Sequence, residues 1–172
     1  MRIENEILLD FSDVLIRPKR STLSSRKQVD LQRTFTFRNE KQWTGIPIIA
    51  ANMDGVGTIS MQKSLEKHEI LTCLVKHLDM YDLPFNENWS PKPDRFMYST
   101  GTNQEDFERI SNNILHTKCE FICIDVANGY TEKLSNFVSS MRKMYPNHTI
   151  VAGNVATGDM TQELSLIHIS EP

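Results

Sequence analysis

The strongest constraint on the fold is a series of short apolar runs at nearly constant spacing. The runs occupy residues 46–51, 70–75, 95–99, 121–126 and 149–153. Taking Ala51, Val75, Ser99, Asp125 and Gly153 as strand ends gives steps of 24, 24, 26 and 28 residues, which fit one strand plus one helix. The runs lack polar alternation, which is typical of strands covered on both faces. The pattern predicts an α/β fold with a parallel sheet.

The segments between the runs carry helical signals. A helix is predicted over 131–145, where apolar residues recur with helical spacing. A second helix is expected to open with a capping box at 102–105, and Thr58 is expected to cap a third. The segment 77–94 contains three prolines and predicts at most a short helix followed by a loop.

The N-terminal part follows a different pattern. Residues 10–17 predict extended structure that stops at Pro18, which lacks a backbone donor. A basic, hydroxyl-rich loop follows at 19–27, and 31–37 has the composition of a short strand. An open, doubly wound sheet of five strands remains an alternative to a closed barrel, which usually needs ~250 residues.

Composition excludes several functional classes. The formal net charge of -3 argues against a strongly basic nucleic-acid-binding surface. No apolar run reaches the ~20 residues of a membrane span, and the first residues lack the apolar core of a secretory signal. An odd number of cysteines, three, argues against a disulfide scaffold. We therefore expect a cytoplasmic protein without membrane or nucleic-acid partners.

Polar residues follow the predicted strands at the edge where parallel α/β folds collect functional groups. Lys76 follows an apolar run and is either a solvated lysine or a fixed cation for an anionic group. Asp125 ends an otherwise apolar run, so its carboxylate must meet solvent, a donor or a ligand. The pattern predicts a rim that binds an anionic small molecule.

The cysteines and histidines suggest no metal centre. Cys119 and Cys123 would lie about 13 Å apart along a strand, too far to share a zinc ion. Buried apolar side chains explain them better, and no cysteine stands beside a base as a nucleophile would. We expect the histidines at 68, 116 and 148 to lie on the surface.

Four stretches of the sequence resemble the GMP reductase branch of the IMP dehydrogenase/GMP reductase family. They are Phe11–Ser21, Ile46–Thr58, Ile124–Tyr130 and Ala152–Val155, within a resemblance that runs from Met1 to about Leu164. The resemblance implies a TIM (β/α)8 barrel, here its first five βα units. It also implies NADPH-dependent conversion of GMP to IMP and ammonia.

IMP dehydrogenase is the alternative within the same family. That branch commonly inserts a regulatory domain after the second barrel strand, whereas only 22 residues separate Lys76 from Ser99 here. GMP reductase is therefore the better match. One departure is Gly55, where the family commonly has threonine.

The resemblance also implies roles for individual residues. Lys76 is implied at the reaction site and at the cofactor. The implied NADPH contacts are Ser25, Arg26, Lys76, Asp125, Val126 and Ala127, with Arg26 suited to a phosphate. The implied contacts to the purine nucleotide are Asn52, Met53, Asp54 and Asn154. The resemblance implies a homotetramer for the full-length protein, and any K+ site would lie outside this chain.

The family's nucleophilic cysteine would follow Leu164, where this chain instead reads Ser165–Pro172. We expect 1–164 to be the N-terminal part of a barrel, with N-terminal strands and a loop in 1–45 and the βα units in 46–164. Residues 165–172 are expected to be an unrelated, adapter-like tail, with a strand over 164–169 as the alternative. The expected product is an inactive, poorly folded fragment. Its inward-facing residues would be Ile48, Leu74, Met97, Ile122 and Val151.

Overall fold

The computed structural model describes residues 7, 9–78, 81 and 90–166, in two compact units. The first unit, Met1–Asp30, contains two short 3-10 helices, η1 (Phe11–Asp13) and η2 (Arg26–Gln28). Extended structure was expected over all of 10–17, and this is wrong at η1. The Asp10 carboxylate accepts the Phe11 N–H at 2.7 Å, and the Asp13 carboxylate accepts the Asp10 N–H at 2.9 Å. These local bonds favour a turn over an extended backbone.

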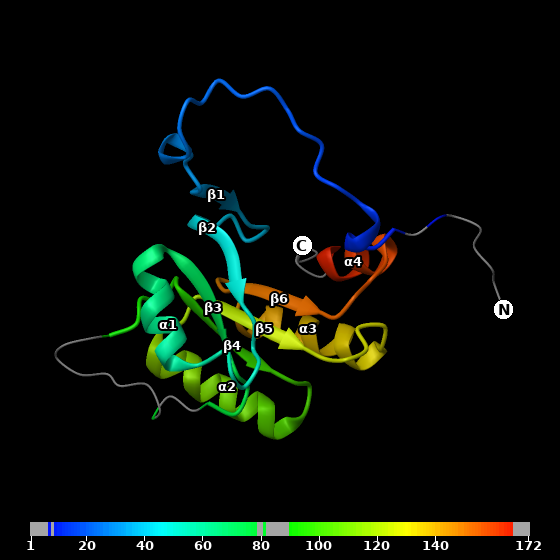
Figure 1. Ribbon diagram of the computed structural model, residues 1–172. Helices are drawn as coiled ribbons and strands as arrows, with labels where there is room; N and C mark the ends of the chain where they lie inside the picture. Colours follow the sequence, from blue (N-terminus) through cyan, green and yellow to red (C-terminus); the bar gives the residue numbers. More distant parts are fainter. Residues whose placement is uncertain (1–6, 8, 79–80, 82–89, 167–172) are drawn as a thin grey trace. The chain divides into compact units, whose positions relative to one another are not determined.

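The second unit, Leu31–Pro172, is built on one six-stranded sheet (Figure 1). Its strands are β1 (Arg33–Thr36), β2 (Gln42–Ala50), β3 (Ile70–Leu74), β4 (Phe96–Thr100), β5 (Phe121–Asp125) and β6 (Thr149–Gly153). They lie side by side in chain order. β1 and β2 form an antiparallel hairpin, and β2 to β6 are parallel. The predicted strand ends agree with the observed ones to within one residue.

Helices follow four of the parallel strands. They are α1 (Ile59–Leu65), extended by η3 (Glu66–His68), and then α2 (Gln104–Thr117), α3 (Glu132–Met144) and α4 (Gly158–Leu166). The helix expected over 131–145 is confirmed as α3. The Thr58 hydroxyl caps α1 by accepting the Met61 N–H at 3.2 Å, as expected.

The capping box expected at 102–105 is wrong. Asn103 is the N-cap of α2, and its side chain makes no capping bond. The Asn103 amide oxygen instead accepts a hydrogen bond from Lys133 Nζ at 3.0 Å. A contact with the neighbouring helix α3 has replaced the local one, which sequence spacing cannot reveal.

Two predicted segments lie largely outside the described residues. Within 77–94, residues 79–80 and 82–89 are not described, and the same holds for 167–172 of the expected tail. Residues 164–166 belong to α4, so the alternative of a strand beginning at Leu164 is wrong there.

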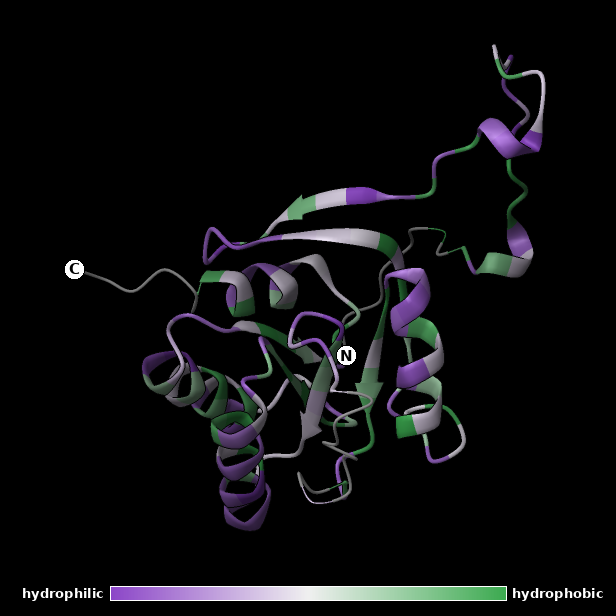
Figure 2. Ribbon diagram, turned by 90° about the vertical axis from the view of Figure 1, so that its left-hand side faces the viewer, coloured by the Kyte–Doolittle hydropathy of each residue, from purple (hydrophilic) through white to green (hydrophobic). Residues whose placement is uncertain are grey.

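The two faces of the sheet carry separate apolar cores. The larger core packs against α2, α3 and α4 and includes Leu74, Phe96, Tyr98, Ile122 and Ile124. The smaller one, on alternate positions, comprises Trp43, Leu71, Cys73, Met97 and Phe121. Figure 2 shows the hydrophobic and hydrophilic residues that alternate along the helices, as one-sided packing requires. Leu74 and Ile122 were expected to face inward but pack on the helix side.

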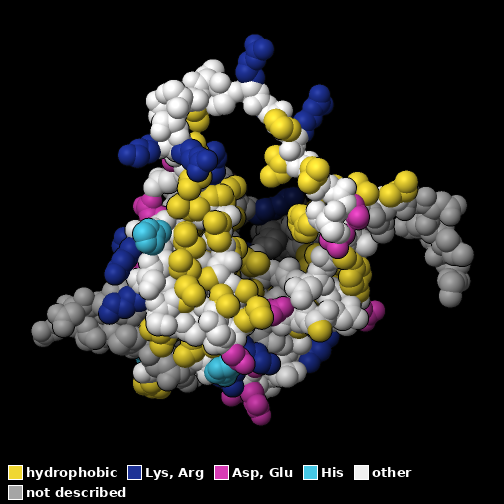
Figure 3. All heavy atoms as spheres, viewed as in Figure 1, with side chains coloured by type: hydrophobic (Ala, Val, Ile, Leu, Met, Phe, Trp, Pro, Cys, Tyr) yellow, Lys and Arg dark blue, Asp and Glu magenta, His cyan; other side chains and the backbone are white. Residues whose placement is uncertain are grey.

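β2 departs from the expectation of a strand covered on both faces. Ile48 and Ile49 are 58% and 52% exposed, beside a register shift between Ile46 and Ile49. Figure 3 shows hydrophobic side chains gathered on the surface where β2 lies. An apolar pocket of about 220 Å³ there is lined by Phe35, Phe37, Trp43, Pro47, Ile48, Ile49 and Leu71. Among the described residues, no helix has the length and apolar character needed to cross a membrane.

Candidate functional site

The parallel strands bring the predicted site residues of the second unit to one edge of the sheet. Asn52 follows β2, Lys76 follows β3, Asp125 ends β5 and Asn154 follows β6. Because β2 to β6 run in the same direction, their carboxyl ends share an edge, where α/β proteins bind ligands. We call this edge the carboxyl rim.

A side-chain hydrogen bond connects two separated positions on the rim. Asn52 Nδ2 donates to Asp125 Oδ2 at 2.8 Å, and both residues are half-buried. Two strands, β3 and β4, separate β2 from β5 in the sheet. Each residue was predicted to lie on the rim, but their pairing was not, because 73 positions separate them in the sequence.

Backbone hydrogen bonds join the loops that follow β5 and β6. The Val126 N–H donates to the Gly153 carbonyl, and the Asn154 N–H donates to the Val126 carbonyl, each at 2.9 Å. The Gly129 N–H reaches the Asn154 carbonyl, also at 2.9 Å. A Cβ at Gly129 would collide with that carbonyl oxygen, so only glycine allows this approach. The stretch Asp125–Ala127 is therefore held in place by the β6 loop.

Tyr130 reinforces the same junction. Its hydroxyl accepts the Ala156 N–H at 2.9 Å and donates to Thr157 Oγ1 at 3.2 Å. Sequence reasoning gave Tyr130 no role of its own. Its position directly after Gly129 could have drawn attention to it, although its partners Ala156 and Thr157 could not have been identified.

Lys76 has an exposed side chain and a fixed backbone. The Lys76 carbonyl oxygen accepts Arg109 Nη1 at 3.2 Å, and Arg109 also pairs with Asp106 at 3.3 Å. Helix α2 thus holds the backbone of this rim residue. Sequence reasoning missed Arg109, since its helical spacing marks it only as part of a polar face.

Residues 52–57 form a turn that packs on the end of β3. The Val75 N–H donates to the Gly57 carbonyl at 3.0 Å, and a Cβ on Gly57 would collide with the Cys73 carbonyl. Met53 is 63% exposed and Asp54 is exposed as well. Open space surrounds Gly55, so the threonine common in the family would fit there without rearrangement.

Ser25 and Arg26 belong to the first unit. The Ser25 hydroxyl caps η2 by accepting the Lys27 N–H at 3.3 Å, and Arg26 is exposed in the same turn. Both side chains are accessible on a short, capped turn. Their roles as cofactor contacts remain predictions.

The cysteines are held as structural thiols. Cys73 and Cys123 share the face of the smaller core, and a hydrogen bond between them raises the pKa of Cys73, together with burial and the charge of Asp125. The same bond lowers the pKa of Cys123, against burial and Asp125. Burial raises the pKa of Cys119 to about 12. Cys73, Cys119 and Cys123 are all free thiols.

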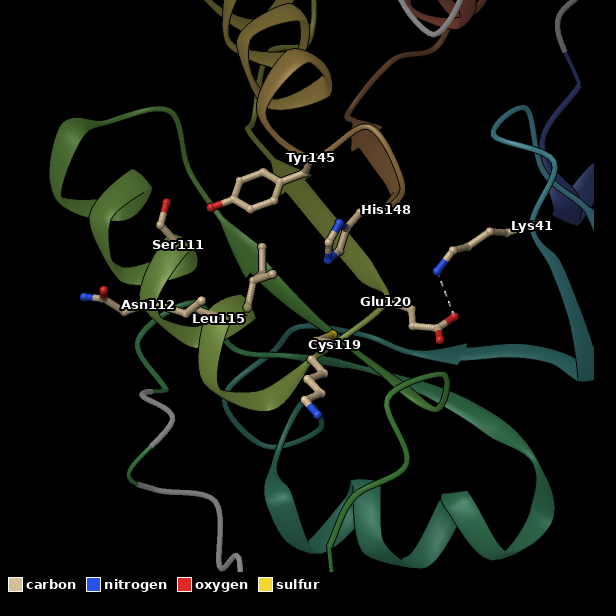
Figure 4. Close-up of a pocket in the computed structure, with 10 residues that line it drawn as sticks. Lys41, Ser111, Asn112, Leu115, Cys119, Glu120, Tyr145 and His148 are labelled. Carbon is tan, nitrogen blue, oxygen red and sulfur yellow. Dashed lines mark ion pairs between the residues drawn. The ribbon is translucent and has the colours of Figure 1, made fainter.

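The largest described pocket lies at the opposite edge of the sheet (Figure 4). Its volume is about 610 Å³, and its lining residues come from α2, from the segments just before β5 and β6, and from Lys41 just before β2. Lys41 and Glu120 pair there at 3.4 Å. The residues that line it are Lys41, Ser111, Asn112, Ile114, Leu115, Lys118, Cys119, Glu120, Tyr145 and His148. The amino ends of the parallel strands form this edge, and residues there usually contribute to stability rather than to catalysis.

His148 in this pocket was expected at the surface, which is wrong. The side chain is half-buried against Tyr145, with ring centroids 5.3 Å apart. Burial, and next the charge of Lys41, lower the pKa of His148. Within the described part of the chain, no three His, Cys, Asp or Glu residues are grouped so as to hold a metal ion.

Comparisons with known proteins agree with the resemblance. The IMP dehydrogenase / GMP reductase domain matches residues 92–170. GMP reductase 2 of Bos taurus is 51% identical over 170 residues, which are 95% of this chain and 48% of that protein. GMP reductase of Vibrio vulnificus strain YJ016 is 48% identical, with 96% of this chain and 49% of that protein covered. The chain thus spans about half the length of the curated relatives it matches.

A solved structure gives the same result for the fold. Inosine 5' monophosphate dehydrogenase from Legionella pneumophila superposes with a TM-score of 0.71 at 23% identity, covering 91% of this chain and 47% of that one. The α/β fold with a six-stranded, mainly parallel sheet is confirmed; the closed barrel and its unit count stay predictions. The resemblance inferred from the sequence motifs is also confirmed: residues 92–170 match the IMP dehydrogenase / GMP reductase domain, and proteins named GMP reductase are similar to this chain over 95–96% of its length.

Proposed function

We propose that this chain contributes the carboxyl rim of a GMP reductase, which uses NADPH to convert GMP to IMP and ammonia. The observation that carries the proposal is the 48–51% identity to proteins named GMP reductase along nearly the whole chain. The rim geometry supports it, because the residues given roles by the resemblance in the second unit lie on one edge. The substrate, the cofactor and the reaction all belong to the proposal.

The rim residues fit a nicotinamide nucleotide. Asp125 presents a half-buried carboxylate with one oxygen bound by Asn52, which leaves the other to accept a ligand hydroxyl. Ala127 is exposed and small, so a flat ring can lie against it. Arg26 belongs to the first unit, and its role is a separate part of the proposal: its planar guanidinium suits a phosphate. When bound, NADPH supplies the hydride.

The same edge offers groups for the purine nucleotide. Met53 presents an exposed apolar side chain suited to a base, and Asp54 presents a carboxylate that accepts hydrogen bonds from hydroxyl or amino groups. Asn154 lies at the junction of the two loops, where its backbone is fixed. Lys76 provides a cation that stabilises negative charge developing during the reaction.

The cysteines of this chain are unsuited to the covalent step that the resemblance implies. Cys73 and Cys119 are buried with raised pKa values, and Cys123, whose pKa the hydrogen bond to Cys73 lowers, packs against the smaller core. A thiol attack on the purine would thus depend on sequence found in the other half of the relatives. We also propose that this chain alone is inactive and that the protein is cytoplasmic. For the full-length protein, the proposal includes a homotetramer and a K+ ion.

IMP dehydrogenase activity is the second candidate, favoured by the structural match. To distinguish the two activities, residues 1–164 are joined to the remaining half of bovine GMP reductase 2, and both reactions are assayed. We expect NADPH oxidation that requires GMP, and no NAD+ reduction with IMP. The 172-residue chain, assayed in parallel, should show neither activity. The reverse preference in the joined protein would refute the proposal.

Lys76→Ala in the joined protein tests the role of the exposed cation. We expect kcat to fall by about 10²–10³-fold, the usual loss when one stabilising charge or donor is removed. Thermal unfolding should be unchanged, because the side chain is exposed. A near-normal kcat would refute this role and show that Lys76 is an ordinary solvated lysine.

Arg26→Ala tests the cofactor contact. We expect the KM for NADPH to rise more than the KM for GMP, since only the cofactor phosphate loses a partner. Lys27→Ala, which removes an exposed charge from the same turn, serves as the control. An equal rise in both KM values would argue against a specific cofactor contact.

A further inference from the structure

The hydrogen bond between Asn52 and Asp125 joins the side chains of two predicted site residues. The β5 and β6 loops are joined instead through backbone groups and through Tyr130, which sequence reasoning gave no role. Asn52 is itself well supported, because its turn packs on β3 at Gly57, whose carbonyl accepts the Val75 N–H at 3.0 Å. The bond therefore joins an amide on a packed turn to the half-buried Asp125 carboxylate.

The surroundings of Asp125 leave the orientation of its carboxylate to Asn52. On the same face of the sheet lie Cys73 and Cys123, whose thiols are hydrogen-bonded to each other. Among the described residues, the Asn52 amide is the donor that binds a carboxylate oxygen of Asp125. The amide is neutral, so it donates a hydrogen bond and leaves the negative charge of the carboxylate in place. A lysine at this position would cancel that charge. A second carboxylate at this position would repel the first.

We propose that Asn52 is a positioning residue that acts through Asp125. Its amide binds Oδ2 and so directs Oδ1 into the rim, where it accepts hydrogen bonds from the hydroxyl groups of a bound nucleotide. The ligand class rests on the proposed function, but the positioning of Asp125 does not. A contact between Asn52 and the ligand is not required.

The first experiment measures the side-chain torsion of Asp125 without a ligand. Three-bond couplings to the carboxylate carbon are recorded by NMR on the 172-residue chain and on its Asn52→Ala and Asn112→Ala variants. Asn112 is the matched control, since it is an exposed amide on α2 away from the rim. We expect a single χ1 rotamer in the unmodified chain and in Asn112→Ala, and averaged couplings in Asn52→Ala. A single rotamer in Asn52→Ala would overturn the proposal, as would averaging in the unmodified chain.

The second experiment measures NADPH binding by fluorescence in a double-mutant cycle of Asn52→Ala and Asp125→Ala. We expect Asn52→Ala to weaken binding by about tenfold when Asp125 is present and to have no effect in the Asp125→Ala background. Equal losses in both backgrounds would show a structural or direct role and overturn the proposal. If the unmodified chain does not bind NADPH, the proposal that this chain binds the cofactor is refuted. The NMR couplings then still decide whether Asn52 positions Asp125.

Discussion

Arg142 should control the stability of the turn between α3 and β6. It is 9% exposed, and its Nη1 lies 3.2, 2.8 and 2.9 Å from the carbonyl oxygens of Tyr145, Pro146 and His148. One guanidinium nitrogen thus satisfies three carbonyl groups in the turn that follows α3. Burial lowers the pKa of Arg142, so part of the gain is offset by desolvation of the charge.

Arg142→Met removes these bonds while retaining most of the aliphatic stem. Hydrogen bonds to charged groups contribute about 1.5–3 kcal/mol, and partly buried carbonyls left without a donor add to the loss. One nitrogen shares two protons among three acceptors, so the contributions are not additive. We therefore expect the free energy of unfolding to fall by about 2–4 kcal/mol, a large part of the ~5–15 kcal/mol typical of a domain.

Urea unfolding followed by circular dichroism measures this loss. With a slope of about 2 kcal/mol per molar urea, the midpoint should fall by about 1–2 M. Lys143→Met is the matched control, because it removes a charge from the neighbouring exposed position of the same helix. If Arg142→Met cost no more than the control, the three carbonyl contacts would not stabilise the turn.

Two further outcomes follow from the described contacts. Since burial lowers the pKa of His148, the unfolded chain takes up this proton first as the pH falls below about 6.5. Stability should therefore decrease from that pH downward, and His148→Gln should flatten the decrease in urea unfolding measured between pH 7.5 and 5.5; an unchanged slope would contradict this. Gly129→Ala should destabilise by about 1–3 kcal/mol through collision with the Asn154 carbonyl. Gly55→Ala, surrounded by open space, should cost little, and similar losses in both variants would refute the steric argument.

The sequence could locate the strand ends because strand length and spacing are local properties. Each apolar run ends where polar or turn-forming residues begin, and the residues after Ala50, Leu74 and Gly153 were correctly placed on one edge. The direction of individual side chains was less predictable. A strand that is apolar on both faces has no alternation to mark its sides, so Leu74 and Ile122 were assigned to the wrong face.

The contacts that shape the rim depend on residues far apart in the chain. Asn52 meets Asp125 across 73 positions, and Arg109 reaches the Lys76 carbonyl across 33. Neither pairing leaves a trace in local composition or spacing. A contact between distant residues also explains why no capping box forms at Thr102–Glu105. The Asn103 side chain accepts a hydrogen bond from Lys133 on α3 and does not cap α2.

The order of the strands has a consequence for synthesis on the ribosome. Each strand from β2 to β6 pairs with the strand made immediately before it, so none of them needs to wait for a distant partner. Contacts between neighbouring units keep the closing loops short, which favours rapid folding of a parallel sheet that would otherwise form slowly. The emerging polypeptide can therefore add one strand and its helix at a time, in the order in which they leave the exit tunnel.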